Sequence, residues 1–179
     1  LAPLLGDGAH LVGHSYGGVI ALLIAGRHPD RVRSLTVNEP PAFGVARGRP
    51  EVEQLVAGLA EHMVSGPSDP RAFLDGFRAL VGFAANVPDP LPPELEQGVR
   101  ALMVERPPWE AELPLDELAA TPFPKLVVSG AHNPAFDAVC DVLEERLDAE
   151  RAVLPGAGHS LPRAPGYPER LKTFLDRHT

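Results

Sequence analysis

The stretch that decides the fold spans residues 11–23 and reads LVGHSYGGVIALL, with Ser15 bracketed by glycines. The run just before the serine, residues 9–13, is short and apolar and stops at a glycine, which predicts a buried strand. Residues 16–27 carry apolar side chains around most of a helical circumference, which predicts a helix buried on nearly all sides. The pattern G-x-S-x-G at residues 13–17 therefore lies where a strand turns sharply into a helix.

Such a turn gives the serine a chemical use. It lifts the hydroxyl above the carboxyl end of a sheet, and glycine allows the close approach of strand and helix because it has no Cβ. The backbone N–H of Tyr16 falls at the N-terminus of the helix, where it can bind a developing oxyanion. A glycine-rich turn without chemistry is the alternative, but the strand before it and the helix after it favour a nucleophile elbow.

The rest of the chain continues the alternation of strand and helix. Strands are predicted at residues 34–38 and 125–129 and within the run RAVLPGAGH at residues 151–159, and helices at residues 136–147 and 168–178. We therefore expect an α/β fold, a parallel sheet with helices on both faces. Residues 40–124 interrupt this alternation with dense prolines and helical periodicity, which predicts an inserted helical segment.

A serine hydroxyl is a poor nucleophile and needs a base. Of the seven histidines, His159 lies on a glycine-rich loop after the last predicted strand, at the same edge of the sheet as Ser15. We predict His159 as the base and His14 in the elbow as a residue lining the site. His14 and His132 are the next candidates for the base. The chain has one cysteine and no H-E-x-x-H motif, so we predict neither a metal site nor a cofactor.

The runs GHSYGG, KLVVSG and GAGHSLP resemble those of the α/β-hydrolase superfamily, and the resemblance covers nearly the whole chain. It implies Ser15 as nucleophile and His159 as base. It also implies a core of residues 1–39 and 125–179, with residues 40–124 as a variable cap or lid over the active site.

One departure from the family concerns position along the chain. In the family the serine follows the fifth of about eight strands, whereas here it follows the first predicted one. We therefore expect this chain to be the C-terminal part of a hydrolase, without the earlier strands and without the loop that supplies a second oxyanion-hole N–H. The serine strand would then present an unpaired edge. A short protein that completes its sheet as a homodimer is the alternative.

A second departure concerns the acid. The family's acid follows the third strand predicted here in a pattern like G-x-x-D-P, and this chain places Asn133 at that position. Asn133 also suits a helix N-cap followed by proline. Because an amide supplies no charge, two carboxylates are possible surrogates: Glu39, which ends the second strand, and Asp137, in the first turn of the next helix. A third option keeps Asn133 as a substitution in an otherwise ordinary enzyme.

These features predict a serine hydrolase that cleaves a carboxylic ester or related acyl bond through an acyl-enzyme. Phe43 and Trp109 are candidates for contacts with a small apolar ester or acyl substrate, and full activity is not expected of these 179 residues alone. The competing hypothesis is a degenerate, non-catalytic domain that binds a ligand or partner. The net charge of −8 does not favour a nucleic-acid partner. No apolar run reaches the roughly 18 residues of a membrane span, and we expect a cytoplasmic protein.

Overall fold

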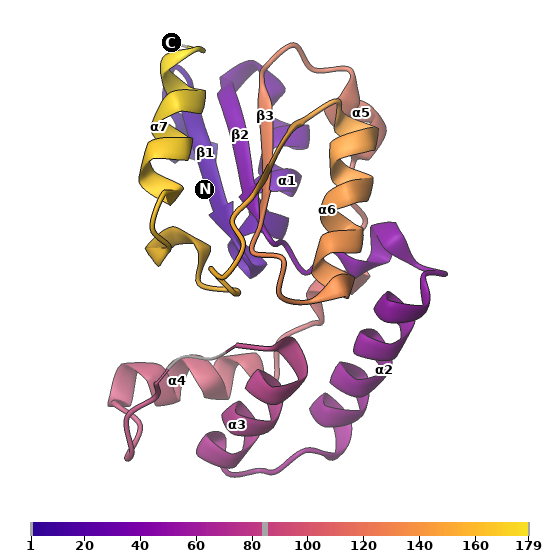
Figure 1. The fold of residues 1–179 in the computed structure, drawn as a ribbon, viewed down its shortest axis with the longest axis vertical. Coiled ribbons are helices and arrows are strands. Elements are labelled where there is room, and N and C mark those ends of the chain that lie inside the picture. The colour runs from indigo at the N-terminus through magenta and orange to yellow at the C-terminus, as the bar shows by residue number, and fades with distance from the viewer. Residues whose placement is uncertain (1, 84–85, 179) are drawn as a thin grey trace.

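The computed structural model describes residues 2–83 and 86–178, which include a four-stranded parallel sheet in the order β1-β2-β3-β4 (Figure 1). Its architecture confirms the predicted α/β fold class. The strands are β1 (Ala9–His14), β2 (Val32–Asn38), β3 (Lys125–Ser129) and β4 (Glu150–Val153). The α-helices are α1 (Tyr16–Arg27), α2 (Pro50–Ser65), α3 (Pro70–Val81), α4 (Pro93–Leu102), α5 (Leu115–Ala119), α6 (Pro134–Leu147) and α7 (Tyr167–Asp176), and the 3-10 turns are η1 (Ala2–Leu5), η2 (Pro29–Arg31), η3 (Phe43–Ala46), η4 (Pro108–Glu110) and η5 (Leu161–Arg163).

Helices cover both faces of the sheet, with α1, α5 and α6 on one side and α7 on the other (Figure 1). The buried strand β3 has apolar side chains on both faces of the sheet. Val127 packs in the cluster that includes α1 and α6, whereas Leu126 and Val128 pack against α7. Successive side chains of a strand point to opposite faces, so a strand covered on both sides is apolar throughout.

The helices α2, α3 and α4 lie together beyond one end of the sheet (Figure 1). Each begins with a proline at its first position, where the missing N–H costs nothing. Asp69 caps α3 by accepting a hydrogen bond of 2.9 Å from the Ala72 N–H. The face of α2 that the periodicity predicts is buried in the main core, through Val52, Leu55, Val56 and Leu59.

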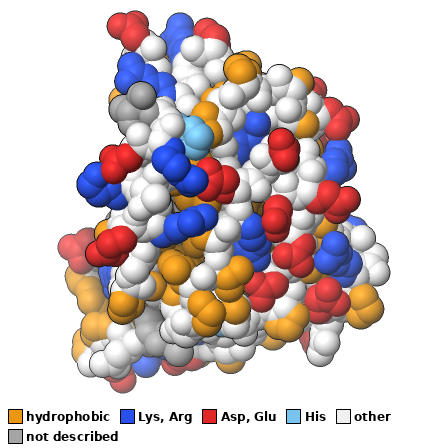
Figure 2. Space-filling view, turned by 45° about the horizontal axis from the view of Figure 1, so that its top comes forward, with side chains coloured by type: hydrophobic (Ala, Val, Ile, Leu, Met, Phe, Trp, Pro, Cys, Tyr) orange, Lys and Arg blue, Asp and Glu red, His pale blue; other side chains and the backbone are white. Residues whose placement is uncertain are grey.

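Acidic and basic side chains are mixed over the face drawn in Figure 2, with apolar side chains between them. Exposed side chains of the described residues also form ion pairs one helical turn apart, such as Glu96 with Arg100 and Arg71 with Asp75. Exposed pairs of this kind contribute little to stability. Within the described ranges, no helix combines the length and the apolar character needed to cross a bilayer.

The carboxyl ends of the parallel strands meet at one edge of the sheet, and the backbone ladder continues past them. The Ser15 N–H, just after β1, donates to the Asn38 carbonyl at 2.9 Å, and the Glu39 N–H, just after β2, donates to Val128 at 3.0 Å. Residues that follow different strands are thereby held side by side. This edge is where open α/β sheets place their ligands.

Candidate active site

Ser15 lies at a strained turn between β1 and α1. Its backbone has φ 53°, in the left-handed region that non-glycine residues rarely adopt. The strand and helix approach so closely there that a Cβ on Gly13 would lie 2.4 Å from the Gly17 carbonyl oxygen and 2.7 Å from the Gly18 Cα. Gly13 is therefore required by space, as the sequence pattern predicts. A Cβ on Gly18 would lie 3.0 Å from that of Pro40, whereas Gly17, the second glycine of the pattern, has no atom within 4 Å of an added Cβ. The strain at Ser15 presents the hydroxyl at the edge of the sheet.

His159 reaches Ser15 from the loop that follows β4. The two side chains are joined by a hydrogen bond of 2.9 Å, in which Ser15 Oγ faces Nε2 of the imidazole. The ring is 8% exposed and packs against Phe136, with ring centroids 4.9 Å apart. His14 holds the same loop, because its Nε2 donates to the His159 carbonyl at 2.6 Å, and burial lowers the pKa of His14 and favours its neutral form.

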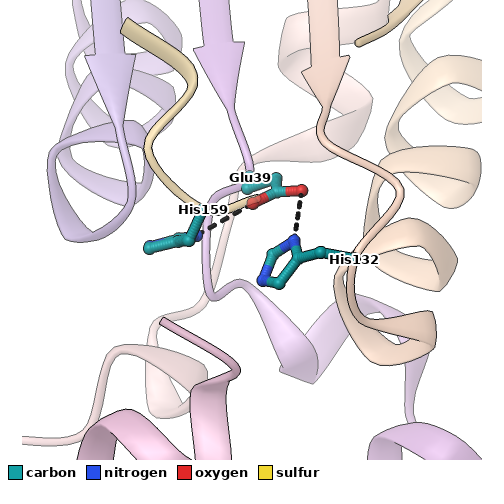
Figure 3. A group of neighbouring side chains, drawn as sticks. All are labelled: Glu39, His132 and His159. Carbon is teal, nitrogen blue, oxygen red and sulfur yellow. Dashed lines mark hydrogen bonds and ion pairs between the residues drawn. The ribbon is translucent and has the colours of Figure 1, made fainter. Parts of the chain in front are cut away.

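Glu39 completes the chain of hydrogen bonds from its place directly after β2 (Figure 3). Its Oε2 accepts a hydrogen bond of 2.9 Å from Nδ1 of His159. Its Oε1 faces two further donors, the Gly130 N–H at 2.6 Å and Nδ1 of His132 at 3.2 Å. The residue is 1% exposed and has φ 42°, so its backbone is strained like that of Ser15.

The carboxyl group of Glu39 is held in its charged form. Burial by itself raises the pKa of the Glu39 carboxyl, but the hydrogen bonds from His132, His159 and the Gly130 N–H outweigh that effect and lower the pKa to about 2. Glu39 is therefore a full anion at neutral pH, beside the imidazole that faces Ser15.

The structure places the other two candidate acids elsewhere. Asn133 is the N-cap of α6, where its Oδ1 accepts from the Ala135 N–H at 3.0 Å and its Nδ2 donates to the Val81 carbonyl at 3.3 Å. The carboxylate of Asp137 lies 3.6 Å from the guanidinium of Arg151. Among the described residues, Glu39 is the carboxylate that the hydrogen bonds bring to His159.

Tyr16 takes the predicted place at the first position of α1. The first N–H groups of a helix have no intrahelical acceptor and lie at the positive end of its dipole. The Tyr16 N–H directly follows Ser15 and is thus available to an oxyanion that forms on a carbonyl group attacked by that hydroxyl.

A cavity of about 220 Å³ opens beside Ser15 and His159. Phe43 and Trp109 contribute to its wall, as the sequence suggests, with ring centroids 6.3 Å apart. Its remaining walls come from segments far apart in sequence, including α2, α3, α4 and α6, which sequence periodicity could not bring together. The lining residues are Ser15, Tyr16, Pro41, Phe43, Leu59, Phe77, Val81, Leu102, Pro108, Trp109, Phe136 and His159.

Glu39, His132 and His159 are of residue types that also bind metal ions, and their polar atoms lie within 4.8 Å of one another. In this structure those atoms are engaged with one another and with the neighbouring backbone (Figure 3). The sequence identified His132 only as a further candidate base and did not predict that His132 contacts Glu39.

Comparison with known proteins agrees with this fold. Lipase LipV of Mycobacterium tuberculosis is 33% identical to the chain over 188 residues, which cover 92% of the chain and 68% of LipV. The chain also superimposes on a carboxylesterase structure from Nitrososphaera gargenis with TM-score 0.65 at 17% identity, covering 99% of this chain and 68% of that one. Proline iminopeptidase of Mycobacterium smegmatis gives TM-score 0.59 at 19% identity, with the same coverage. These two structures support the fold.

The comparison with protein families covers almost the entire sequence. The sequence model of the Alpha/beta hydrolase family matches residues 1–170. Together with the identity to LipV, this match establishes that the chain belongs to the Alpha/beta hydrolase family.

Proposed function

We propose that the protein is a serine esterase in which Ser15 is the nucleophile, His159 the general base and Glu39 the acid. The observation that carries the proposal is the continuous chain of hydrogen bonds from Ser15 Oγ through the imidazole to the Glu39 carboxylate, with both distances at 2.9 Å. The order of roles along such a chain is that of a Ser-His-acid triad. A carboxylate in the third place also answers one reason for expecting a degenerate, non-catalytic domain, the amide of Asn133 at the family's acid position.

The geometry supports the usual two-step acyl transfer. As Ser15 Oγ attacks the ester carbonyl, Nε2 of His159 takes its proton, and the carboxylate of Glu39 stabilises the imidazolium that forms. The Tyr16 N–H stabilises the negative charge that develops on the carbonyl oxygen. His159 then returns the proton to the departing alcohol, and a water molecule activated by the same imidazole releases the acid from Ser15.

The cavity supports an apolar acyl chain or aromatic group as the part of the substrate that is bound. Apart from Ser15, Tyr16 and His159, its walls are aliphatic, proline and aromatic side chains. Its volume of about 220 Å³ is roughly seven times the ~30 Å³ that one water occupies in the liquid. A straight acyl chain of about four to eight carbon atoms therefore fits, whereas a long fatty acyl chain would extend beyond it.

Residues from α2, α3 and α4 form part of this wall, which supports the interpretation of residues 40–124 as a cap over the site. Phe77 of α3 and Leu102 of α4 face the cavity from this segment. A cap built from separate helices could change the substrate range without altering the triad.

Labelling with a fluorophosphonate probe tests the proposal without knowledge of the natural substrate. We expect stoichiometric labelling of Ser15, lost in Ser15→Ala and retained in the control Ser68→Ala, which changes an exposed serine in the loop between α2 and α3. Hydrolysis of p-nitrophenyl esters should peak at butyrate to octanoate. Absence of labelling in a folded wild-type protein would overturn the proposed function.

A further inference from the structure

We propose that His132 is a positioning residue, held as an imidazolium between the Glu39 carboxylate and the C-terminal end of α3, that fixes the triad acid toward His159. The proposal rests on the function proposed above, because it assigns to His132 an action through Glu39. It concerns a residue outside the Ser-His-acid chain itself.

Proton counting at the His132 ring supplies the first argument. Nδ1 faces Oε1 of Glu39 at 3.2 Å, and Nε2 faces the Val81 carbonyl oxygen at 3.2 Å. Both partners are acceptors, and a neutral imidazole has only one N–H to donate. Both contacts are hydrogen bonds only when the ring carries two protons, so the geometry selects the cation.

The surroundings of His132 favour the same charge state. Val81 is the last residue of α3, and a cation is stabilised at the negative end of a helix dipole. The titratable side chains that act on the ring are the carboxylates of Glu39 and Asp137 and the ring of His159, whose centroid is 5.8 Å away. The hydrogen bond to Glu39 raises the pKa of His132; burial opposes this, and the charge of Glu39 reinforces it.

The role of the cation follows from the freedom of a glutamate side chain. The terminal torsion of Glu is broad and roughly two-fold, so one donor on Oε1 does not fix the plane of the carboxylate. The Gly130 N–H and His132, both in the loop between β3 and α6, together bind Oε1 and leave Oε2 to His159. Each oxygen of the carboxylate faces one of the two rings, so its negative charge offsets the positive charge of His132 close to His159 (Figure 3).

His132 also connects the acid to the cavity wall. Its second contact ends at Val81, which lines the cavity, so one ring links the triad acid to the helix that packs over the substrate. Asn133 donates to the same carbonyl, which gives the C-terminus of α3 two side-chain donors from the loop after β3.

The test measures the rate at which a fluorophosphonate labels Ser15, from about pH 5 to about pH 9, in the wild type and in His132→Gln. Glutamine can donate to one acceptor but restores neither the charge nor the bridge. At neutral pH we expect His132→Gln to be labelled about tenfold more slowly, the size associated with one hydrogen bond between charged groups. The difference should shrink as the pH rises through the pKa of His132, and His132→Lys should recover part of the rate.

His62→Gln is the matched control, because Nε2 of His62, in α2, also contacts a backbone carbonyl of α3, that of Phe73, at 2.9 Å. Its rate and pH profile should equal those of the wild type. Nitrogen-15 NMR of the wild-type imidazoles adds a readout independent of the variants, and should show His132 protonated on both nitrogens at neutral pH. Labelled Ser15 with an unchanged rate in His132→Gln, or a single-proton His132 tautomer, would overturn this inference alone. Unlabelled Ser15 would overturn the proposed function as well.

Discussion

Replacing Glu39 by glutamine tests the assignment of the triad acid most directly. The substitution keeps the size and shape of the side chain and removes one negative charge. We expect kcat for p-nitrophenyl butyrate to fall by about 10⁴-fold, the loss that the Ser-His-Asp template shows when its acid becomes an amide. At 1.36 kcal/mol for each factor of ten, this is a barrier increase of about 5.5 kcal/mol.

The contacts of Glu39 explain why Glu39→Gln should lose the full factor of about 10⁴ in kcat. The three donors that face the carboxylate are the Gly130 N–H, Nδ1 of His132 and Nδ1 of His159. A glutamine offers a single oxygen, which goes to the side where two donors meet. Its NH₂ group then faces His159 and forces the tautomer that carries its proton on Nε2, which cannot accept the proton of Ser15. At 1% exposure of Glu39, water has no room to correct the arrangement.

Asn133→Asp and Asp137→Asn complete the assay as matched controls at the two competing positions. If Glu39 is the acid, an aspartate at the N-cap of α6 adds charge away from His159 and raises kcat little, and Asp137→Asn leaves kcat unchanged. Circular dichroism and thermal melts verify that each variant is folded. Retention of more than about a tenth of kcat in Glu39→Gln, or a gain of about tenfold or more in Asn133→Asp, would refute the assignment.

Three other outcomes are expected. The pKa of Glu39 is depressed to about 2, so Glu39 contributes about 3 kcal/mol to the free energy of unfolding. This contribution is complete above the unfolded pKa of 4.5 and disappears as the pH falls toward 2. Urea titrations at several pH values should show the loss in the wild type and not in Glu39→Gln. Trp109→Ala removes part of the cavity wall and should shift the preferred p-nitrophenyl ester to a longer acyl chain, with an unchanged preference counting against an acyl pocket. The strand β1 lies at an edge of the described sheet, where Val12 is 47% exposed. Residues 1–179 alone should therefore self-associate in light scattering, and a monodisperse monomer would contradict this.

Local patterns were sufficient to predict most of the fold. The run ending at Gly13 and the glycines around Ser15 predict the strand, the turn and the helix, because each of these elements depends on residues that are close in sequence. The proximity of His159 to Ser15 was predicted from its position in the sequence, since a loop after a parallel strand begins at the edge of the sheet where Ser15 lies. The strand at 125–129 and the α6 helix agree with their predicted bounds to within two residues.

The acid could not be chosen from sequence, because long-range geometry decides it. Glu39, Asn133 and Asp137 all follow strands that end at the same edge, so each is a reasonable candidate by position. Glu39 reaches His159 because its backbone turns through a positive φ and its carboxylate meets the Gly130 N–H of the neighbouring loop. Neither condition leaves a mark in the sequence around residue 39.

The location of the acid has a consequence for the loop after β3. Strands β2 and β3 are adjacent and parallel, so a carboxylate at the end of either can approach the same imidazole. If Glu39, directly after β2, has the proposed role, the loop after β3 does not have to carry a charge for His159. Its side chains serve other contacts. His132 and Asn133 both contact the Val81 carbonyl, and His132 and the Gly130 N–H also contact Glu39. The contacts of Asn133, as a cap for α6 and a donor to the C-terminus of α3, account for the asparagine in the family's acid position. On the proposed assignment of Glu39, this asparagine does not imply a weakened triad.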